Sequence, residues 1–196
     1  MKKKSILHWF LFAFGLISII SLFSGCERTI TKNDFNGGFE AKSKLGNEPA
    51  GWYATRVPET KDFVVFAWDS TEQHTGKYSV SIAIDSIHPQ NVIAYNWTRT
   101  FDDFIVGKKY SISGWIKAKN LNETAWLVVQ CWDDNQKLIG LASTQSSSPV
   151  KGTTDWAQVK SEITIPNDTK EVRVRVGIAS PRNNGGKVWF DDIKIE

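Results

Sequence analysis

The chain has 196 residues, of which 24 are basic and 21 acidic. This length suits one domain with one hydrophobic core and excludes two domains of comparable size. Three of the basic residues lie within the first 25 positions, and without them the basic and acidic residues balance. The balance argues against the cationic surface that binding to nucleic acid requires.

The N-terminal segment has the layout of a bacterial secretory signal. Lysines at positions 2 to 4 precede an apolar run over residues 6–23, which ends at Ser24-Gly25-Cys26; this order is typical of secretory signals. Phe23-Ser24-Gly25-Cys26 resembles a lipobox, in which cleavage makes the cysteine the new N-terminus and the carrier of the lipid. We therefore predict a lipoprotein signal peptide over residues 1–25, with lipidation at Cys26.

The alternative for this segment is an uncleaved transmembrane anchor, because the apolar run is about long enough to cross a hydrocarbon core of ~30 Å. Both alternatives tether the rest of the chain to a membrane from outside the cytoplasm. We expect a location in the bacterial cell envelope, either periplasmic or on the cell surface.

Residues 26–32 are short and polar and form a predicted tether, and a single module follows over residues 33–196. The second of the two cysteines, Cys131, lies in an apolar stretch of this module. Because Cys26 is expected to carry the lipid, we predict no internal disulfide.

The module has the pattern of an all-β domain. Short runs rich in Val, Ile, Tyr, Trp and Thr alternate with Gly, Asn, Asp and Pro, and no long amphipathic helical stretch stands out. Nine strands in this length favour a two-sheet β-sandwich over a closed barrel. The predicted strands are residues 52–57, 63–68, 78–84, 92–100, 110–117, 126–132, 156–165, 171–176 and 188–195, and residues 143–149 form a serine-rich loop.

Alternation along two strands predicts which side chains face outward, because successive residues of a strand point to opposite faces. In residues 126–132 the core set is Leu127, Val129 and Cys131, which leaves Trp126, Gln130 and Trp132 on the other face. In residues 171–176 the valines point inward, so Arg173 and Arg175 point outward. The two strands together present tryptophan, glutamine and arginine to the outside.

The last strand places a carboxylate on an apolar face. Asp191 shares its face with Trp189, Ile193 and Ile195, whereas Asp192 lies on the other side and is expected to be solvated. An unpaired carboxylate in apolar surroundings costs several kcal/mol. We therefore expect Asp191 to be ion-paired, hydrogen-bonded or metal-bound.

The module contains, in chain order, the motifs Asn36-Gly37-Gly38-Phe39-Glu40, Pro49-Ala50-Gly51-Trp52, Thr75-Gly76-Lys77-Tyr78, Gly107 to Ala118, Trp156-Ala157-Gln158-Val159 and Val188-Trp189-Phe190-Asp191-Asp192-Ile193. Together these motifs resemble carbohydrate-binding modules of families four, nine and twenty-two. In these modules the fold is a galactose-binding-domain-like jelly roll, which the resemblance implies for this chain from about residue 36 to its end. Most of the shared residues build the scaffold, so the resemblance is less specific for ligand than for fold.

The resemblance also implies a structural calcium ion, which in this family ties the first strand to the last. Carried onto this chain, the implied ligands are Glu40, the backbone oxygens of Gly76 and Lys77, and Asp191. Calcium takes about 6 to 8 hard oxygen ligands in irregular geometry, which suits carbonyl and carboxylate groups. The alternative is that Asp191 pairs with a lysine or caps backbone amides near the chain end.

The function that the resemblance implies is non-catalytic binding of a polysaccharide or oligosaccharide. A sugar offers C–H faces and hydroxyl rims, so its site needs aromatic platforms with polar groups at their edges. We predict Trp126, Gln130, Trp132, Arg173 and Arg175 as the ligand contacts. Burial of the tryptophans under loops, as a satellite core, is the alternative.

Other aromatic residues fall into two groups. Weaker candidates for ligand contact are Trp68, Tyr95, Trp97 and Arg99, because the sequence does not fix which face their strands expose. The tryptophans at scaffold positions of the family are interpreted as structural; they are Trp52, Trp115, Trp156 and Trp189.

We expect no enzymatic activity, because the sequence has neither a metal-ligand spacing nor a serine nucleophile elbow. The expected partners are a glycan and, through the lipid on Cys26, a membrane, with the module itself monomeric and no nucleic acid bound. Two alternatives stay open. One is an envelope protein-protein interaction module that uses the same sandwich, and the other is a small glycan-active enzyme.

Overall fold

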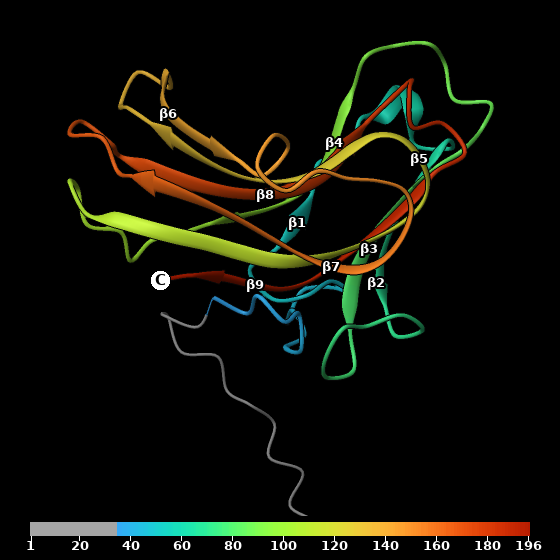
Figure 1. The fold of residues 1–196 in the computed structure, drawn as a ribbon, viewed down its shortest axis with the longest axis horizontal. Coiled ribbons are helices and arrows are strands. Elements are labelled where there is room, and N and C mark those ends of the chain that lie inside the picture. The colour runs from blue at the N-terminus through green and yellow to red at the C-terminus, as the bar shows by residue number, and fades with distance from the viewer. Residues whose placement is uncertain (1–34) are drawn as a thin grey trace, which may run out of the picture.

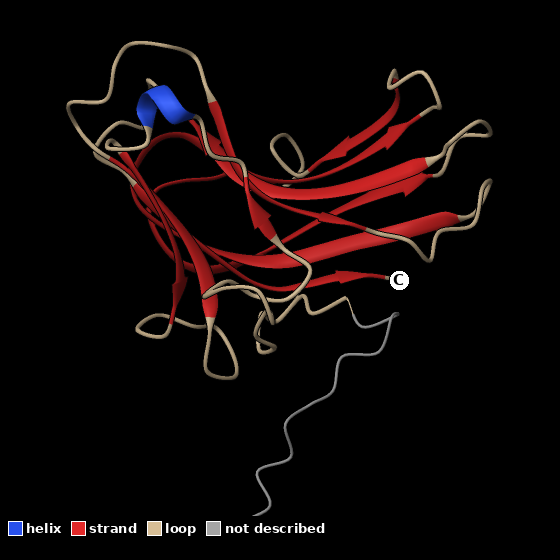
Figure 2. Ribbon diagram, turned by 180° about the vertical axis from the view of Figure 1, so that it is seen from behind, coloured by secondary structure: helices blue, strands red, loops and turns tan. Residues whose placement is uncertain are grey.

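The computed structural model describes residues 35–196, and this part of the chain is nearly all β (Figures 1 and 2). The one helical element described in it is the 3-10 turn η1, drawn in blue in Figure 2. The predicted signal peptide, tether and lipidation site at Cys26 lie outside the described residues. The elements are β1 Tyr53–Ala54, η1 Pro58–Thr60, β2 Val64–Asp69, β3 Ser79–Ile84, β4 Ala94–Thr100, β5 Lys109–Trp132, β6 Leu138–Ser143, β7 Val150–Thr164, β8 Glu171–Ala179 and β9 Lys187–Ile195.

Two antiparallel sheets share the long strand β5. Its first part pairs with β7 and β9, and its last part, from Trp126, pairs with β6 and β8. One sheet has the order β1-β4-β8-β5-β6 and is called the β8 sheet below; the other has the order β2-β3-β9-β5-β7 and is called the β9 sheet. Figure 1 shows them as two layers, which confirms the predicted all-β sandwich.

The core lies between the two layers and is built from alternate residues. In the β8 sheet Val172, Val174 and Val176 are fully buried, as are Leu127 and Cys131 on β5. Burial of an aliphatic side chain of this size contributes about 1.5–3 kcal/mol. The inward parity predicted for both strands is confirmed, so their remaining side chains lie on the outer face of the β8 sheet.

The strands differ most from the prediction at β5 and β6, while β1 is shorter and β7 and β8 are longer than predicted. Residues 110–117 and 126–132 form one strand, because Ala118, Leu121 and Ala125 still pair with β7 across register shifts. The polar residues between them concealed this continuity. Strand β6 was missed because Gly140 interrupts its apolar run; a Cβ at Gly140 would lie 2.8 Å from a ring carbon of Pro166.

None of the helices in the described part of the chain is both long and apolar enough to cross a membrane.

Candidate carbohydrate-binding site

The five predicted ligand contacts all belong to the outer side of the β8 sheet. Gln130 lies opposite Arg173 in the pairing of β5 with β8, and Arg175 lies opposite Val128. Because paired residues in antiparallel strands point to the same side, these side chains form one surface. We call it the binding face and define it by its strand residues Tyr53, Thr98, Trp126, Val128, Gln130, Trp132, Leu138, Leu141, Glu171, Arg173 and Arg175.

Arg173 is held in place on this face by three neighbours. Its Nε and one terminal nitrogen each donate to an oxygen of Glu171 at 2.6 Å, and that terminal nitrogen also donates to Gln136 Oε1 at 3.0 Å. Its guanidinium lies 4.9 Å from the ring centre of Trp132. The hydrogen bonds to Glu171 raise the pKa of Arg173, and the same contact lowers the pKa of Glu171.

Arg175, two residues further along β8, has no such partner. Among the described residues no carboxylate lies within ion-pairing distance of it, and its Nε is buried without a hydrogen bond. Burial lowers the pKa of this guanidinium; Arg173 also lowers it, whereas Tyr53 and Glu171 partly offset the shift. The face therefore carries one neutralised arginine and one arginine without a counter-charge.

Four buried polar atoms of the face lack hydrogen-bond partners. They lie on three adjacent strands and are Thr98 Oγ1, Gln130 Oε1, Trp132 Nε1 and Arg175 Nε. A buried polar atom without a partner costs about 1–3 kcal/mol, and native proteins hold few of them. Four of the seven atoms of this kind in residues 35–196 belong to this face, so it is where most of the unmet hydrogen-bonding capacity of the described residues lies.

The face also exposes apolar groups that the sequence did not point out. Tyr53 is 48% exposed and lies opposite Thr98, and on β6 Leu138 and Leu141 are 39% and 57% exposed. Alternation could have identified Tyr53, because Trp52 before it is buried. The two leucines escaped notice because their strand was not predicted.

Trp126 supports the face and offers little surface to a ligand. It is 9% exposed, and its indole nitrogen donates to Asn96 Oδ1 at 3.2 Å. It lies opposite Gly177, where a Cβ would be only 2.2 Å from the carbonyl oxygen of Tyr95. This burial agrees with the satellite-core alternative for Trp126, whereas Trp132 keeps a partly exposed ring.

None of the four weaker candidates lies on the binding face. Tyr95 and Trp97 are each 1% exposed and belong to the core between the sheets. Arg99 points inward and donates to the carbonyl of Ala50 at 3.1 Å. Trp68 stacks on Tyr78 with ring centres 4.2 Å apart.

The tryptophans interpreted as structural are spread over the molecule. Trp52 is buried in the core and Trp189 is buried on the outer side of the β9 sheet, where its indole donates to Asp69 Oδ2 at 2.9 Å. Trp115 and Trp156, on the same outer side, flank His74, whose ring stacks on Trp115 at 3.9 Å. All four agree with scaffold roles.

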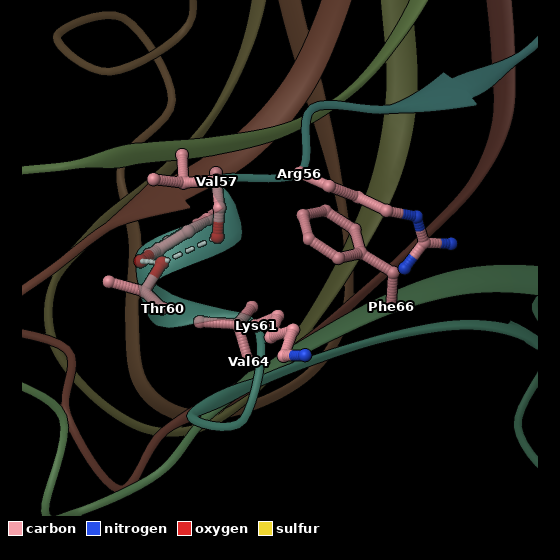
Figure 3. A pocket seen from close by; sticks show the side chains of 7 residues that line it. Arg56, Val57, Thr60, Lys61, Val64 and Phe66 are labelled. Carbon is pink, nitrogen blue, oxygen red and sulfur yellow. Dashed lines mark hydrogen bonds between the residues drawn. The ribbon is translucent and has the colours of Figure 1, made fainter.

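Two hollows lie away from the binding face. The first, between η1, β2 and β4, has a volume of about 40 Å³, and Figure 3 shows Arg56, Lys61 and Phe66 among the residues around it. A site for a small molecule has a volume of about 300–1,000 Å³. This cavity is therefore too small for a sugar ring.

The second hollow, of about 580 Å³, is open and lies over Lys117 and Trp189 on the outer side of the β9 sheet. Three of its charged groups satisfy one another, since Lys117 lies 3.0 Å from Glu72 and 3.3 Å from Asp155. The ammonium of Lys187 covers the ring of Trp189 at 4.5 Å. The unpartnered groups of the binding face make that face the better candidate.

Asp191, which the resemblance assigns to calcium, is fully buried and caps backbone amides. Its Oδ2 accepts from the amides of His74 and Thr75 at 2.8 and 3.1 Å, and its Oδ1 accepts from that of Asp192 at 2.7 Å. Burial raises the pKa of Asp191 to about 6 despite these bonds. The expectation that this carboxylate is hydrogen-bonded is confirmed. The predicted apolar face was wrong: Ile193 and Ile195 pack in the core, whereas Asp191 lies opposite Trp115 on the outer side of the β9 sheet, because the alternation breaks at Asp192.

Glu40 plays a similar part at the neighbouring turn. Its Oε1 accepts from the amides of Lys77 and Tyr78 at 2.8 and 3.0 Å, and Gly76 before them has φ +69°. The fit to calcium is partial. Asp191 and Glu40 are carboxylates bound to the two ends of the loop of residues 74–78. However, residues 35–196 hold no group of three or more His, Cys, Asp or Glu arranged for a metal. Calcium binding by Glu40, Gly76, Lys77 and Asp191 stays a prediction.

The expectation that Asp192 is solvated was wrong. Its carboxylate lies 2.7 Å from Nδ1 of His74 and accepts from the Thr75 hydroxyl at 2.9 Å. The residue has φ +49°, which turns its side chain toward the same loop that Asp191 caps. Strand parity failed here because the backbone leaves the regular strand conformation at this residue.

A family model described as a carbohydrate binding domain matches residues 31–183. The chain belongs to this family. The resemblance to carbohydrate-binding modules is thereby confirmed, and with it the jelly-roll sandwich.

Solved structures with a similar fold include carbohydrate-binding modules and parts of larger proteins. The CBM22-1 xylan-binding domain of Paenibacillus barcinonensis Xyn10C is 15% identical with a TM-score of 0.53, over 82% of this chain and 90% of that one. The enzymatically active domain of tailspike protein 4 of bacteriophage CBA120 is 13% identical with a TM-score of 0.57, over 83% of this chain and 21% of that one. At such identities the likeness concerns the fold alone.

A relative known by sequence is the tRNA nuclease WapA of Bacillus subtilis (strain 168), which is 23% identical over 162 residues. The match covers 82% of this carbohydrate binding domain protein but only 7% of WapA. The chain thus spans a small part of that relative's length.

Proposed function

We propose that the module binds a glycan without cleaving it, on the binding face of the β8 sheet. The observation that carries this proposal is the occurrence of partly exposed aromatic rings, Trp132 and Tyr53, beside four polar atoms without protein partners. Aromatic rings pack against the C–H faces of sugars, and polar side chains bind their hydroxyl groups. Membership of the carbohydrate binding domain family supports the same function.

The spacing of the two rings favours a chain of sugars over a single one. Tyr53 lies in the register row of Thr98, Arg175 and Val128, three strands from β5, and Trp132 is four residues beyond that row. Strand spacings of ~4.8 Å and ~3.3 Å per residue put the two backbone positions roughly 20 Å apart. An oligosaccharide of several units or a polysaccharide is needed to contact both rings.

The face has no pair of carboxylates for hydrolysis. Among the strand residues that define the face, Glu171 is the sole carboxylate, and Arg173 binds both of its oxygens and keeps it ionised. Glycoside hydrolysis generally requires one carboxylic acid and a second carboxylate about 5–9.5 Å away. This arrangement supports binding without catalysis.

We further propose that a lipid on Cys26 anchors a monomeric module to the bacterial envelope. A shallow single site binds with a Kd of roughly micromolar to millimolar, or about −8 to −4 kcal/mol. Many copies on one membrane would engage a polymer at several points and hold it far more tightly than one site.

The second candidate is contact with another protein of the envelope. The exposed Tyr53, Leu138 and Leu141 favour it, because an apolar patch next to polar groups is also typical of protein interfaces. Both candidates use the same face, so a binding assay has to separate them.

The test compares wild type with Trp132→Ala and Trp156→Ala in affinity electrophoresis and calorimetry against a panel of polysaccharides. Trp132 lies on the binding face, and Trp156, on the β9 sheet, is the matched control. We expect at least one glycan to bind, with a loss of about tenfold or more for Trp132→Ala alone, as is usual for an aromatic anchor. Absence of binding across the panel would favour the protein-contact candidate, and release of reducing ends would show catalysis.

A further inference from the structure

Charge is distributed unevenly over the binding face. Glu171 and Arg173 form an ion pair with two hydrogen bonds, called the fork below, whose charges cancel. The described residues supply no counter-ion for Arg175. By register the neighbours of Arg175 are Thr98 on β4 and Val128 on β5, and neither carries a charge. One positive charge therefore lies uncompensated near the middle of the sheet.

The position of the guanidinium makes this charge costly. Its Nε is buried without a partner, while its terminal nitrogens are not among the fully buried unpaired atoms. Burial disfavours the charged form, as the lowered pKa of Arg175 shows. An unpaired, partly desolvated charge is unfavourable unless a partner arrives.

The geometry of the side chain limits what that partner is. A guanidinium presents planar pairs of N–H donors that match the two oxygens of a carboxylate, and such paired bonds are among the strongest in proteins. The same sheet shows this match between Glu171 and Arg173, with both distances at 2.6 Å. Near Arg175, the exposed Tyr53 offers a further hydroxyl for a bound sugar.

We propose that the glycan bound on this face is acidic, and that Arg175 binds a carboxylate of a uronic acid unit in it. This inference rests on the proposed glycan-binding function. A ligand of this kind supplies the counter-charge that the fold lacks, and the terminal nitrogens of Arg175 donate to it. Neutral polymers bind through the aromatic rings but leave this charge unpaired.

The experiment uses a uronic acid polymer, such as polygalacturonate, and the same polymer after reduction of its carboxyl groups. Calorimetry is run on wild type, Arg175→Gln, Arg175→Lys and the control Arg56→Gln, whose arginine pairs with Glu48 away from this face. We expect wild type and the control to bind the acidic polymer about tenfold tighter than the reduced one, which corresponds to about 1.4 kcal/mol. Arg175→Gln should bind both forms alike, and Arg175→Lys should fall between.

Thermal unfolding separates binding from folding. Removal of an uncompensated charge should leave the melting temperature of Arg175→Gln equal to or above that of wild type. Equal affinity of wild type for the two polymers, with other glycans still bound, would overturn the inference and leave the proposed function intact. Failure to bind any glycan would overturn the proposed function itself.

The last ligand tested by calorimetry is a sulfated polymer with the same sugar backbone. Tighter binding of the sulfated polymer than of the uronic acid polymer would overturn the assignment of a carboxylate, because it would show recognition of charge without the planar match. Weaker binding of the sulfated polymer supports the assignment.

Discussion

Glu171 binds Arg173 through both of its carboxylate oxygens and so holds the guanidinium over the ring of Trp132. The two residues are separated by one position on β8, and both side chains are partly exposed. Because the fork fixes one side of the indole, the ring is oriented before any ligand arrives. Preorganised groups lose less entropy on binding.

The first prediction concerns this fork. Glu171→Gln removes the charged partner of Arg173 and loosens the guanidinium over Trp132, so glycan affinity should fall by roughly threefold to tenfold. Calorimetry with the best glycan of the panel measures it, with Glu162→Gln on β7 as the control. An unchanged affinity would show that the indole needs no support from Arg173.

The same fork predicts a dependence of stability on pH. Arg173 lowers the pKa of Glu171, so the ionised Glu171 carboxylate stabilises the folded state. This contribution to the free energy of unfolding is present above the ordinary pKa of 4.5 and is lost as the pH falls through the lowered value. Since both groups are partly exposed, the effect should be small, about 0.5–1 kcal/mol. Unfolding in urea at pH 7 and pH 3 should show a smaller acid loss in Glu171→Gln than in wild type, and identical losses would contradict it.

The second prediction concerns ligand length. Tyr53 and Trp132 lie roughly 20 Å apart by strand spacing, so Tyr53→Ala should weaken binding of long oligosaccharides but not of short ones that reach only Trp132. Trp132→Ala should weaken binding of both. Calorimetry with oligosaccharides of increasing length measures the difference, and an equal loss for Tyr53→Ala at every length would show that the rings bind the same unit.

Strand parity predicted much of the fold and part of the site. It placed Leu127, Val129 and the valines of β8 in the core, and it placed Gln130, Trp132, Arg173 and Arg175 outside. Alternation is reliable there because both strands are regular and one of their faces is buried. The contacts of those side chains were not predictable from the sequence. The ion pair of Arg173 with Glu171 and the lack of a carboxylate partner for Arg175 depend on which residues the neighbouring strands bring close.

Parity was insufficient wherever pairing or backbone conformation departed from the regular pattern. Tyr95 and Trp97 stayed ambiguous because a strand alternates without indicating which side meets the second sheet. Asp192 was misjudged because its positive φ redirects the side chain toward His74. Trp126 has the outward parity but is buried opposite Gly177 and bonded to Asn96, and these neighbours on other strands have no signature in its own strand's sequence.

The third prediction concerns the membrane anchor. Cys26→Ser removes the proposed lipid acceptor, so the protein should move from the membrane fraction to the soluble one, while glycan affinity of the purified module stays the same. Fractionation after labelling with a radioactive fatty acid measures both attachment and location, with Cys131→Ser as the control. Label retained by Cys26→Ser would contradict lipidation there, and membrane retention without label would support the uncleaved anchor.

The fourth prediction concerns the titration of Asp191 in metal-free protein. Burial raises the pKa of this carboxyl to about 6, so its stabilising contribution is fully present below the ordinary value of 3.8 and is lost as the pH rises through about 6. A difference of this size corresponds to about 3 kcal/mol. Carbon NMR should follow this titration directly, and a midpoint below 4 in the presence of chelator would contradict the prediction.

The fifth prediction concerns calcium and uses the same carboxylate. If Asp191 and Glu40 bind the ion, Asp191 must be ionised in the bound state, so added calcium should lower its pKa and flatten the pH dependence just described. A chelator should lower the melting temperature of wild type and of the control Asp62→Asn, but hardly that of Asp191→Asn. Equal responses in all three proteins would remove calcium from this loop and leave the capping of the His74 and Thr75 amides as the whole role of Asp191.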